Sequence, residues 1–478
     1  MKKQRSTKSS ANSIVIFLFV LFIFLIISVL FLRSNNSLIG DDAYFINRIS
    51  HNLLEGKFAS DDLSFQGREV LYNLGLPAVI LGLSIITKLD TLMISKLLLI
   101  LFGIISLYLV YLILKHYKLT DIDMTIVLFI LILSPSFIYL FTVLTEYSAV
   151  VLLSLLGFLL YIKDRRKLSF VVMSLIGLFN LSASILIWFL VFVFLLNKKL
   201  LKQNNFVWIW FLVNLIILAI KFMIGHFEWI SGWWMITSLD AYISDFGSKF
   251  GISIVVLILA LFGIVFDFET KKREIIVYIL FILLILLSLY FYWAIFILSF
   301  FVLLFAFDGT KNLMKRVWEN NFLKNFTFFI LACSILFSGI SYLNVLNKEG
   351  PSQNMIDAMN FLNENTLDNS VVFSSIENGN YITGIANRPV VIDKNEWFVF
   401  GINRRIDDYG LILDSEDVEE TRRLLDSYGV DYILIDKNMK ENIWQYDEKG
   451  LLFLTKYSKA FKIVFANEDV EIWRYFQE

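Results

Sequence analysis

Residues 40–58 read GDDAYFINRISHNLLEGKF and directly follow an apolar run over residues 14–32. Two adjacent carboxylates, Asp41 and Asp42, therefore stand where a membrane helix would meet water. Ionisable residues at such a position are costly and usually functional. Behind them apolar side chains recur every three or four residues, which predicts an amphipathic helix that lies in the interface and does not cross the membrane.

The composition indicates a membrane protein. The chain of 478 residues is 58% hydrophobic and 18% charged, with a mean hydropathy of +0.70. Soluble domains are about 45–50% apolar and about 25% charged. The single cysteine, Cys333, excludes an intramolecular disulfide framework and a cysteine-rich metal site, and the three histidines show no metal-binding spacing.

Apolar runs long enough for membrane helices recur from residue 14 to residue 346. We predict about eleven transmembrane helices, with boundaries uncertain by about 2–4 residues. The runs cover residues 14–32, 91–114, 124–141, 147–162, 168–181, 183–196, 206–224, 250–266, 275–292, 294–307 and 326–346. The pairs 168–196 and 275–307 are each expected to form a hairpin of short helices.

Positive charge is concentrated on one side of this predicted path. With the N-terminus in the cytoplasm, the inner segments 1–13, 115–123, 163–167, 197–205, 267–274 and 308–325 contain 20 Lys and Arg, whereas the outer segments contain 6. This asymmetry follows the positive-inside rule. To preserve it, residues 71–87 must not cross, so we predict an interfacial or re-entrant segment interrupted by Pro77. The basic start followed by an apolar run resembles a signal peptide, but the run is too long and lacks a cleavage site, so an uncleaved first helix is expected.

The polar C-terminal part is then extracytoplasmic. Helical periodicity occurs at 355–364 and 416–428, and short strand-like runs are VVFSS (371–375), RPVVID (388–393) and DYILID (431–436). Residues from 461 onward predict a closing β-hairpin. We therefore predict two domains: a transmembrane domain, residues 1–346 with a first outer loop at 33–90, and an α/β domain, residues 347–478, expected to fold by itself.

Three carboxylates are candidates for chemistry. Asp41 and Asp42 could act as a catalytic base or hold a metal, or could be ordinary charges at a helix start. Glu146, in SPSFIYLFTVLTEYSAVVLL (134–153), opens a predicted span on the same membrane face. Carboxylates that converge from two loops suit a divalent cation or proton abstraction. The same residue could equally be only an N-terminal helix charge.

Outward cations and aromatic residues are candidates for substrate contacts. A phosphate-bearing substrate would need one or two cations, and the main candidates are Arg48, Arg68, Lys221, His226 and Lys249. Arg33 and Lys57 are further outward cations, and most of the set could be plain surface charges. The residues that could line a substrate groove are Tyr44, Tyr72, Trp233 and Trp234, although the tryptophans also fit an aromatic belt. The chain has no Gly-rich nucleotide loop, HExxH, CxxC or GxSxG motif.

Taken in this order, these residues resemble the GT-C superfamily of polytopic membrane glycosyltransferases. It includes oligosaccharyltransferase catalytic subunits, protein mannosyltransferases and lipid A aminoarabinose transferases. The first-loop stretch is similar to the family's acidic opening, and LYNLGLPAVILGL (71–83) is similar to its juxtamembrane segment. Residues 134–153 resemble the second-loop motif, and 377–393 and 424–436 resemble the outer domain of archaeal and bacterial members.

The resemblance implies transfer of a sugar from a polyprenyl-phosphate donor to a protein, lipid or polysaccharide at the outer face of the plasma membrane. Carried over by residue, Asp41 or Asp42 is the first-loop catalytic acid, and Glu146 is the second-loop acid. Oligosaccharyltransferases bind a divalent metal with these acids, Mg²⁺ or Mn²⁺, and other members do not require one. No nucleic acid and no nucleotide is implied.

Two departures from the family pattern are visible. The outer domain lacks the WWDxG acceptor motif. The late hairpin reads LSLYFYWAIF (288–297), without the arginine that many members carry there. A glycosyltransferase is the leading hypothesis. A flippase of lipid-linked saccharides and a non-catalytic GT-C-shaped scaffold remain as alternatives.

The predicted orientation can be tested by cysteine labelling. In a Cys333→Ser background, single cysteines at Ser60, Ser238 and Ser427 should react with an impermeant thiol reagent on intact cells. Cysteines at Asp164 or Glu269 should not react, because their loops are predicted to be cytoplasmic. Labelling at Asp164 without labelling at Ser60 would reverse the topology.

Overall fold

The computed structural model describes residues 14–29, 37–57, 61–67, 73–197, 204–223, 242–269, 275–395, 399 and 402–476, with only the backbone at 221–223. These residues form two compact units. One contains Met1–Asn36 and Ser95–Asn347, and the other contains Ser37–Ile94 and Lys348–Glu478. Most of the first loop thus packs with the C-terminal region. The sequence-based prediction had placed this loop in the transmembrane domain. The functional division into domains stays a prediction.

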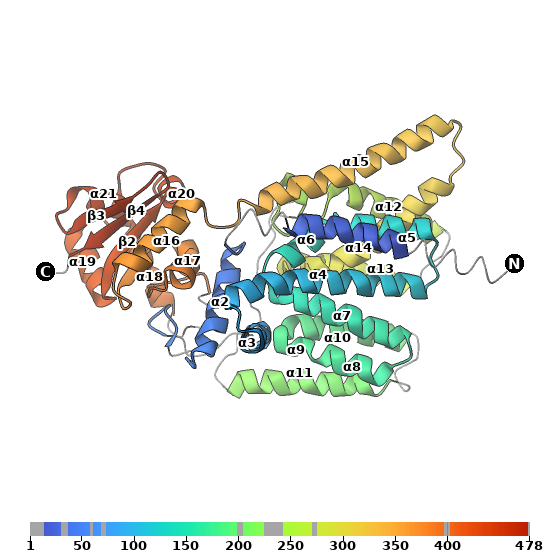
Figure 1. Ribbon diagram of the computed structural model, residues 1–478, viewed down its shortest axis with the longest axis horizontal. Helices are drawn as coiled ribbons and strands as arrows, with labels where there is room; N and C mark the ends of the chain where they lie inside the picture. Colours follow the sequence, from blue (N-terminus) through green and yellow to red (C-terminus); the bar gives the residue numbers. More distant parts are fainter. Residues whose placement is uncertain are drawn as a thin grey trace. The chain divides into compact units, whose positions relative to one another are not determined.

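The first unit is helical (Figure 1). Each predicted apolar run coincides with a described helix or a pair of helices. The elements are the helix Ile14–Val29, α4 (Thr91–His116), α5 (Asp121–Ile132), α6 (Pro135–Thr142), α7 (Glu146–Ile162), α8 (Arg166–Ser174), α9 (Ile176–Phe179), α10 (Leu181–Asn197), α11 (Phe206–Met223), the short turn η4 (Ser244–Phe246), α12 (Ile254–Glu269), α13 (Ile275–Tyr290), α14 (Ala294–Lys315) and α15 (Asn321–Leu346).

By length and composition, three of the described helices can cross a membrane, namely α4, α14 and α15. The pair α5 and α6 makes a fourth candidate, bent by 61°. The bend lies where Ser134, in an extended conformation, precedes Pro135, because a residue before proline is pushed out of the helical region. The other apolar helices are shorter, and the predicted total of about eleven spans remains unconfirmed.

A close contact of backbones joins α12 to α14. A Cβ atom on Gly263 would lie 1.9 Å from the carbonyl oxygen of Phe305, and one on Gly309 would lie 2.0 Å from that of Leu259. Only glycine fits at either position. Small residues are the usual means of bringing membrane helices together, because lipid provides no hydrophobic force between them.

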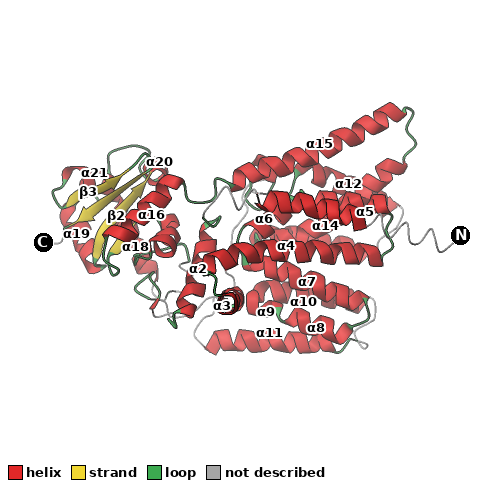
Figure 2. Ribbon diagram, viewed as in Figure 1, coloured by secondary structure: helices red, strands yellow, loops and turns green. Residues whose placement is uncertain are grey.

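The second unit combines two helices of the first loop with an α/β region, and Figure 2 shows its strands. Its elements are α2 (Asp41–Leu54), α3 (Gly75–Thr87), α16 (Gln353–Asn365), β1 (Val371–Phe373), η5 (Ile376–Asn378), α17 (Gly379–Tyr381), η6 (Ile382–Ala386), α18 (Ile402–Asp414), α19 (Val418–Ser427), β2 (Val430–Asp436), α20 (Lys437–Asn442), α21 (Gly450–Tyr457), β3 (Phe461–Ala466) and β4 (Val470–Tyr475).

Its four-stranded sheet has the order β1-β2-β4-β3. Strands β1 and β2 are parallel, and the other two pairs are antiparallel. The strands predicted at 371–375 and 431–436, the helices at 355–364 and 416–428, and the closing hairpin are confirmed. The run RPVVID forms only isolated bridges, from Val390 to Ser64 and to Val372.

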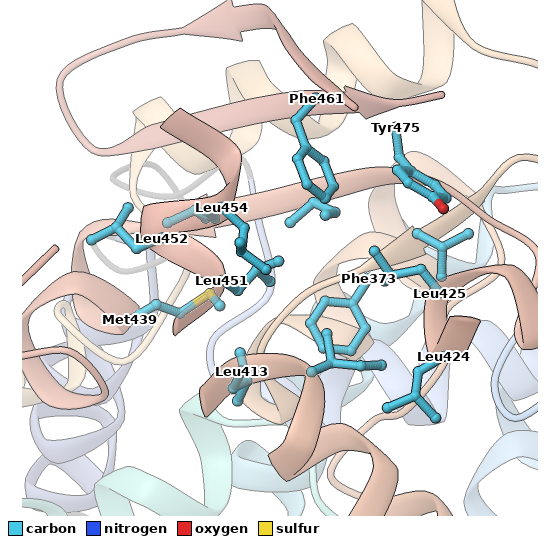
Figure 3. Close-up of a cluster of buried hydrophobic side chains, with 14 of the residues drawn as sticks. Phe373, Leu413, Leu424, Leu425, Met439, Leu451, Leu452, Leu454, Phe461 and Tyr475 are labelled. Atoms are coloured by element: carbon cyan, nitrogen blue, oxygen red, sulfur yellow. The ribbon is translucent and has the colours of Figure 1, made fainter. Parts of the chain in front are cut away.

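Alternating side chains give the sheet two buried faces. On β2, Ile433 and Ile435 face one hydrophobic cluster, whereas Leu434 faces the other. The first cluster is filled by residues of α18, α19 and α21, several of which are labelled in Figure 3. Helix α16 covers the second hydrophobic cluster with Ala358, Met359 and neighbouring apolar side chains of the same helix. This period-2 alternation between two apolar faces explains why the strands are recognisable in the sequence.

Helix α3 differs in one respect from its prediction. Pro77 does not interrupt it, because Pro77 is the third helical residue, and a proline in the first turn needs no intrahelical N–H partner. With 13 residues, α3 is about 20 Å long, at about 1.5 Å per residue. It is therefore too short to span a hydrocarbon core of about 30 Å.

Candidate functional site

Helix α2 carries the two aspartates of the first loop. Gly40, at the N-cap position, has φ 80°, a conformation that glycine adopts readily. Asp41 and Asp42 then occupy the first turn, where carboxylates are favoured by the helix dipole. The sequence predicted an amphipathic helix that lies in the membrane interface, and this placement stays a prediction. Within the protein, most of the side chains of α2 are buried, polar ones among them.

The two aspartates have different surroundings. Asp41 is 7% exposed, and its Oδ2 accepts a hydrogen bond from Lys394 Nζ at 2.8 Å. Asp42 is more accessible and only half-buried. Burial of Lys394 would lower its pKa, but the carboxylates of Asp41 and Asp42 outweigh this and raise the pKa of Lys394 above its usual value. The ammonium therefore stays charged at neutral pH, and the pair is lost as the pH rises through the raised pKa of the lysine.

The residues next to Lys394 are held in place by partly buried hydrogen bonds. Asp393 Oδ1 accepts from the backbone N–H of Asn395 at 2.8 Å, and the Asn380 amide donates to Asn395 Oδ1 at 2.8 Å. Gly379 packs against this segment so closely that a Cβ would lie 2.6 Å from Asp393 Cβ. The backbone on either side of Lys394 is thus fixed.

Arg48 lies at the centre of a buried polar network. It is 4% exposed, and its Nε is 3.2 Å from Asp62 Oδ1, while Nη2 is 3.3 Å from Asp393 Oδ2. Nη1 donates to Ser64 Oγ and to Thr383 Oγ1, and Ser64 Oγ donates to Asp393 Oδ2 at 2.6 Å. This placement disagrees with the prediction that Arg48 contacts a donor phosphate. Two carboxylates already neutralise the guanidinium, and it ties α2 to the C-terminal region.

Tyr44, predicted to line a substrate groove, is packed inside the same unit. It is 1% exposed, and its hydroxyl accepts from the backbone N–H of Leu38 at 3.0 Å. Its ring meets Tyr381 edge-on at 5.2 Å. Burial raises the pKa of Tyr44 to about 12. Burial also strongly raises the pKa of Tyr381, and Asp41 adds to the effect. Both phenols are therefore neutral at neutral pH.

Glu146 begins α7 in the helical unit and is 4% exposed. The side-chain amide of Asn180 donates to its Oε1 at 2.5 Å, and Asn180 Oδ1 accepts from the backbone N–H of Ala183 at the start of α10. The next residue, Tyr147, stacks on Trp293 of the α13–α14 connection at 6.3 Å. Glu146 is thus a buried acid anchored beside that connection. Because the aspartates and Glu146 belong to different units, their predicted convergence stays a prediction.

The remaining candidates are only partly covered by the structure. Lys249 is half-buried, its Nζ lies 5.9 Å from the Phe250 ring centroid, and its backbone carbonyl accepts from the Tyr342 hydroxyl. The side chains of Arg68, Tyr72, Lys221, His226, Trp233 and Trp234 lie outside the described residues. Lys394 was missed in the sequence, because no local pattern relates it to Asp41, 353 positions away.

The described residues show no cluster of three or more His, Cys, Asp or Glu side chains that could hold a metal ion. At the aspartate pair, an ammonium group already occupies one oxygen of Asp41. A divalent cation bound to that same oxygen would have to displace Lys394. A dedicated metal centre calls for several oxygen ligands around one point, so a divalent cation held by Asp41, Asp42 and Glu146 stays a prediction.

No protein-family model and no curated protein matches the chain. Solved structures do. The oligosaccharyltransferase AglB from Archaeoglobus fulgidus, in complex with an inhibitory peptide and a dolichol-phosphate, is similar with a TM-score of 0.61 at 13% identity, over 93% of this chain and 72% of AglB. Another structure of the A. fulgidus oligosaccharyltransferase, with Zn and sulfate, has a TM-score of 0.58 at 12% identity, over 93% of this chain and 71% of that one.

ArnT from Cupriavidus metallidurans is similar over 98% of both chains, with a TM-score of 0.59 at 11% identity. The arabinofuranosyltransferase AftD from Mycobacteria has a TM-score of 0.58 at 13% identity, over 97% of this chain and 40% of AftD. All three proteins are GT-C members, so the chain has a GT-C-like fold. The apolar helices and the membrane location of GT-C proteins together support a membrane location for this chain.

Removing Arg48 should destabilise the second unit. In Arg48→Met, Asp393 and Asp62 lose their buried countercharge, so we expect a loss of about 3–5 kcal/mol. Arg404→Met is the control, because Arg404 is 91% exposed and lies 3.9 Å from Asp408. Pulse proteolysis of the full chain would measure the difference, and equal stability of the two variants would contradict the structural role of Arg48.

Residues 348–478 alone should be less stable than within the full chain, because they lack Arg48 and leave Asp393 without its countercharge. This expectation is contrary to that of an independent domain.

Proposed function

We propose that the chain is an inverting membrane glycosyltransferase that transfers a sugar from a polyprenyl-phosphate donor to an acceptor at the outer membrane face. The observation that carries this proposal is the aspartate pair at the start of α2, with Asp41 bound to Lys394, within a GT-C-like fold. Similar solved structures support it, since one is an arabinofuranosyltransferase and AglB was solved with a dolichol-phosphate.

Within this proposal the two aspartates have separate roles. Asp42 is the more accessible carboxylate and is the base that takes the proton from the acceptor hydroxyl. The acceptor oxygen then bonds to the anomeric carbon, while the bond from that carbon to the phosphate oxygen breaks. Asp41 is buried against Lys394 and positions it. General-base assistance of this kind contributes about 10²–10⁴-fold to a rate.

The location of the reaction rests on the charge asymmetry along the chain. The predicted outer segments include residues 33–90 and the C-terminal α/β region, which together make up the second unit almost entirely. The acceptor would then be a protein, lipid or polysaccharide of the cell envelope. Glu146 is the candidate second acid, which would orient the loop before α7 or contribute to substrate binding.

The base assignment can be tested by isosteric substitution. Asp42→Asn keeps the side-chain volume and removes the base, so transfer of label from a radiolabelled polyprenyl-phosphate sugar should slow by about 10²-fold or more. Asp447→Asn is a suitable control, because Asp447 is 70% exposed and pairs only loosely with Lys449 at 3.5 Å. Near-normal transfer by both Asp42→Asn and Asp41→Asn would reject the catalytic role and favour a scaffold or flippase.

Metal dependence can be tested separately. Because Lys394 supplies positive charge at the aspartate pair, transfer by the purified protein should continue in the presence of EDTA. Loss of transfer that is restored by Mg²⁺ or Mn²⁺ would show instead that the reaction requires a divalent cation. Glu146→Gln would then be expected to raise the metal concentration needed for activity.

A further inference from the structure

The second unit places a cation against its acidic pair. Lys394 comes from the C-terminal region, and Asp41 comes from the first loop. Their charged atoms lie 2.8 Å apart, at the length of a strong charge-assisted hydrogen bond. Of the two side chains, Asp41 is buried, whereas 35% of the Lys394 side chain is accessible.

We propose that Lys394 binds the phosphate of the lipid-linked donor and that Asp41 holds its ammonium in position. This inference rests on the proposed function and names the group that would contact the donor. A lysine ammonium is a compact point charge with three donors, so it can bond to a carboxylate on one side and to a phosphate oxygen on another.

The electrostatics of the site require such a group. Asp41 and Asp42 are adjacent in sequence and lie in the first turn of the same helix. Two carboxylates would repel an anionic donor, because like charges a few ångströms apart raise each other's energy even near a protein surface. The ammonium of Lys394 reduces this repulsion where a phosphate would approach. Its pKa, raised by the same two carboxylates, keeps it protonated at neutral pH.

Buried partners hold the residues on both sides of Lys394. An ordinary surface ion pair needs no such support. Asp393 is fully buried and is held by both Arg48 and Ser64. On the other side, Asn395 is held by Asp393 and by Asn380, which is itself fully buried. Ordering a lysine at a surface usually contributes little to stability. A rigid support beneath one accessible lysine is what a preorganised binding contact requires.

Binding measurements on the full-length protein in lipid nanodiscs test the proposal. The probes are a polyprenyl phosphate without sugar and the matching uncharged polyprenol. Lys394→Gln should weaken binding of the phosphate by about tenfold or more, the size expected for a lost hydrogen bond to a charged group, and leave polyprenol binding unchanged. Lys394→Arg should restore most of the phosphate affinity. Lys437→Gln is the control, because Lys437 is 60% exposed and lies 4.0 Å from Glu441.

The outcomes separate this inference from the proposed function. Unchanged phosphate binding by Lys394→Gln, or equal loss of both lipids, would overturn the phosphate contact and leave the proposed function standing. Equal binding of both lipids by the unmodified protein would count against a phosphate-linked donor altogether. A further test needs no variant: polyprenyl phosphate, but not polyprenol, should slow the modification of Lys394 by an amine-reactive reagent, read by mass spectrometry. Equal modification rates with the two lipids would overturn the contact.

Discussion

A buried arginine between two aspartates is the interaction on which the second unit depends. Arg48 contributes from α2, Asp62 from the first loop, and Asp393 from the C-terminal region. Burying these charges is expensive, and the arrangement is stable only because every partner is present. The network therefore ties α2 to the α/β region, although 345 positions of sequence separate Arg48 from Asp393.

The same network determines where Lys394 lies relative to Asp41 and Asp42. Asp393 is the link, because it binds Arg48 and Ser64 on one side and caps the backbone of Asn395 on the other. Lys394 stands between these fixed residues and reaches Asp41 at the start of α2. A change at Arg48 is thus expected to disturb the acidic pair without touching it. Arg48 is buried and neutralised, so its role is structural. Lys394 is partly accessible, so the proposed chemical role falls to it.

Much of the fold could be predicted from local pattern. Long apolar runs mark the helices, and the alternation in DYILID marks β2, because side-chain periodicity follows directly from backbone geometry. Contacts between distant segments could not be predicted in this way. Arg48 looked like an outward cation because Asp393 is unrelated to it in local sequence. For the same reason, Lys394 carried no visible link to Asp41. RPVVID has the composition of a strand, but only Val390 makes bridges.

We infer that the first loop and the C-terminal region fold as one unit. Native-state hydrogen exchange of the full chain tests it most directly at two amides. The N–H of Val390 donates to the carbonyl of Leu63, and the N–H of Phe65 donates to the carbonyl of Val390. Both should be protected and should open with the same free energy as amides of β2, since residues of one cooperative unit exchange together. Rapid exchange at Val390 and Phe65, with β2 still protected, would show that the first loop detaches by itself and would contradict the claim.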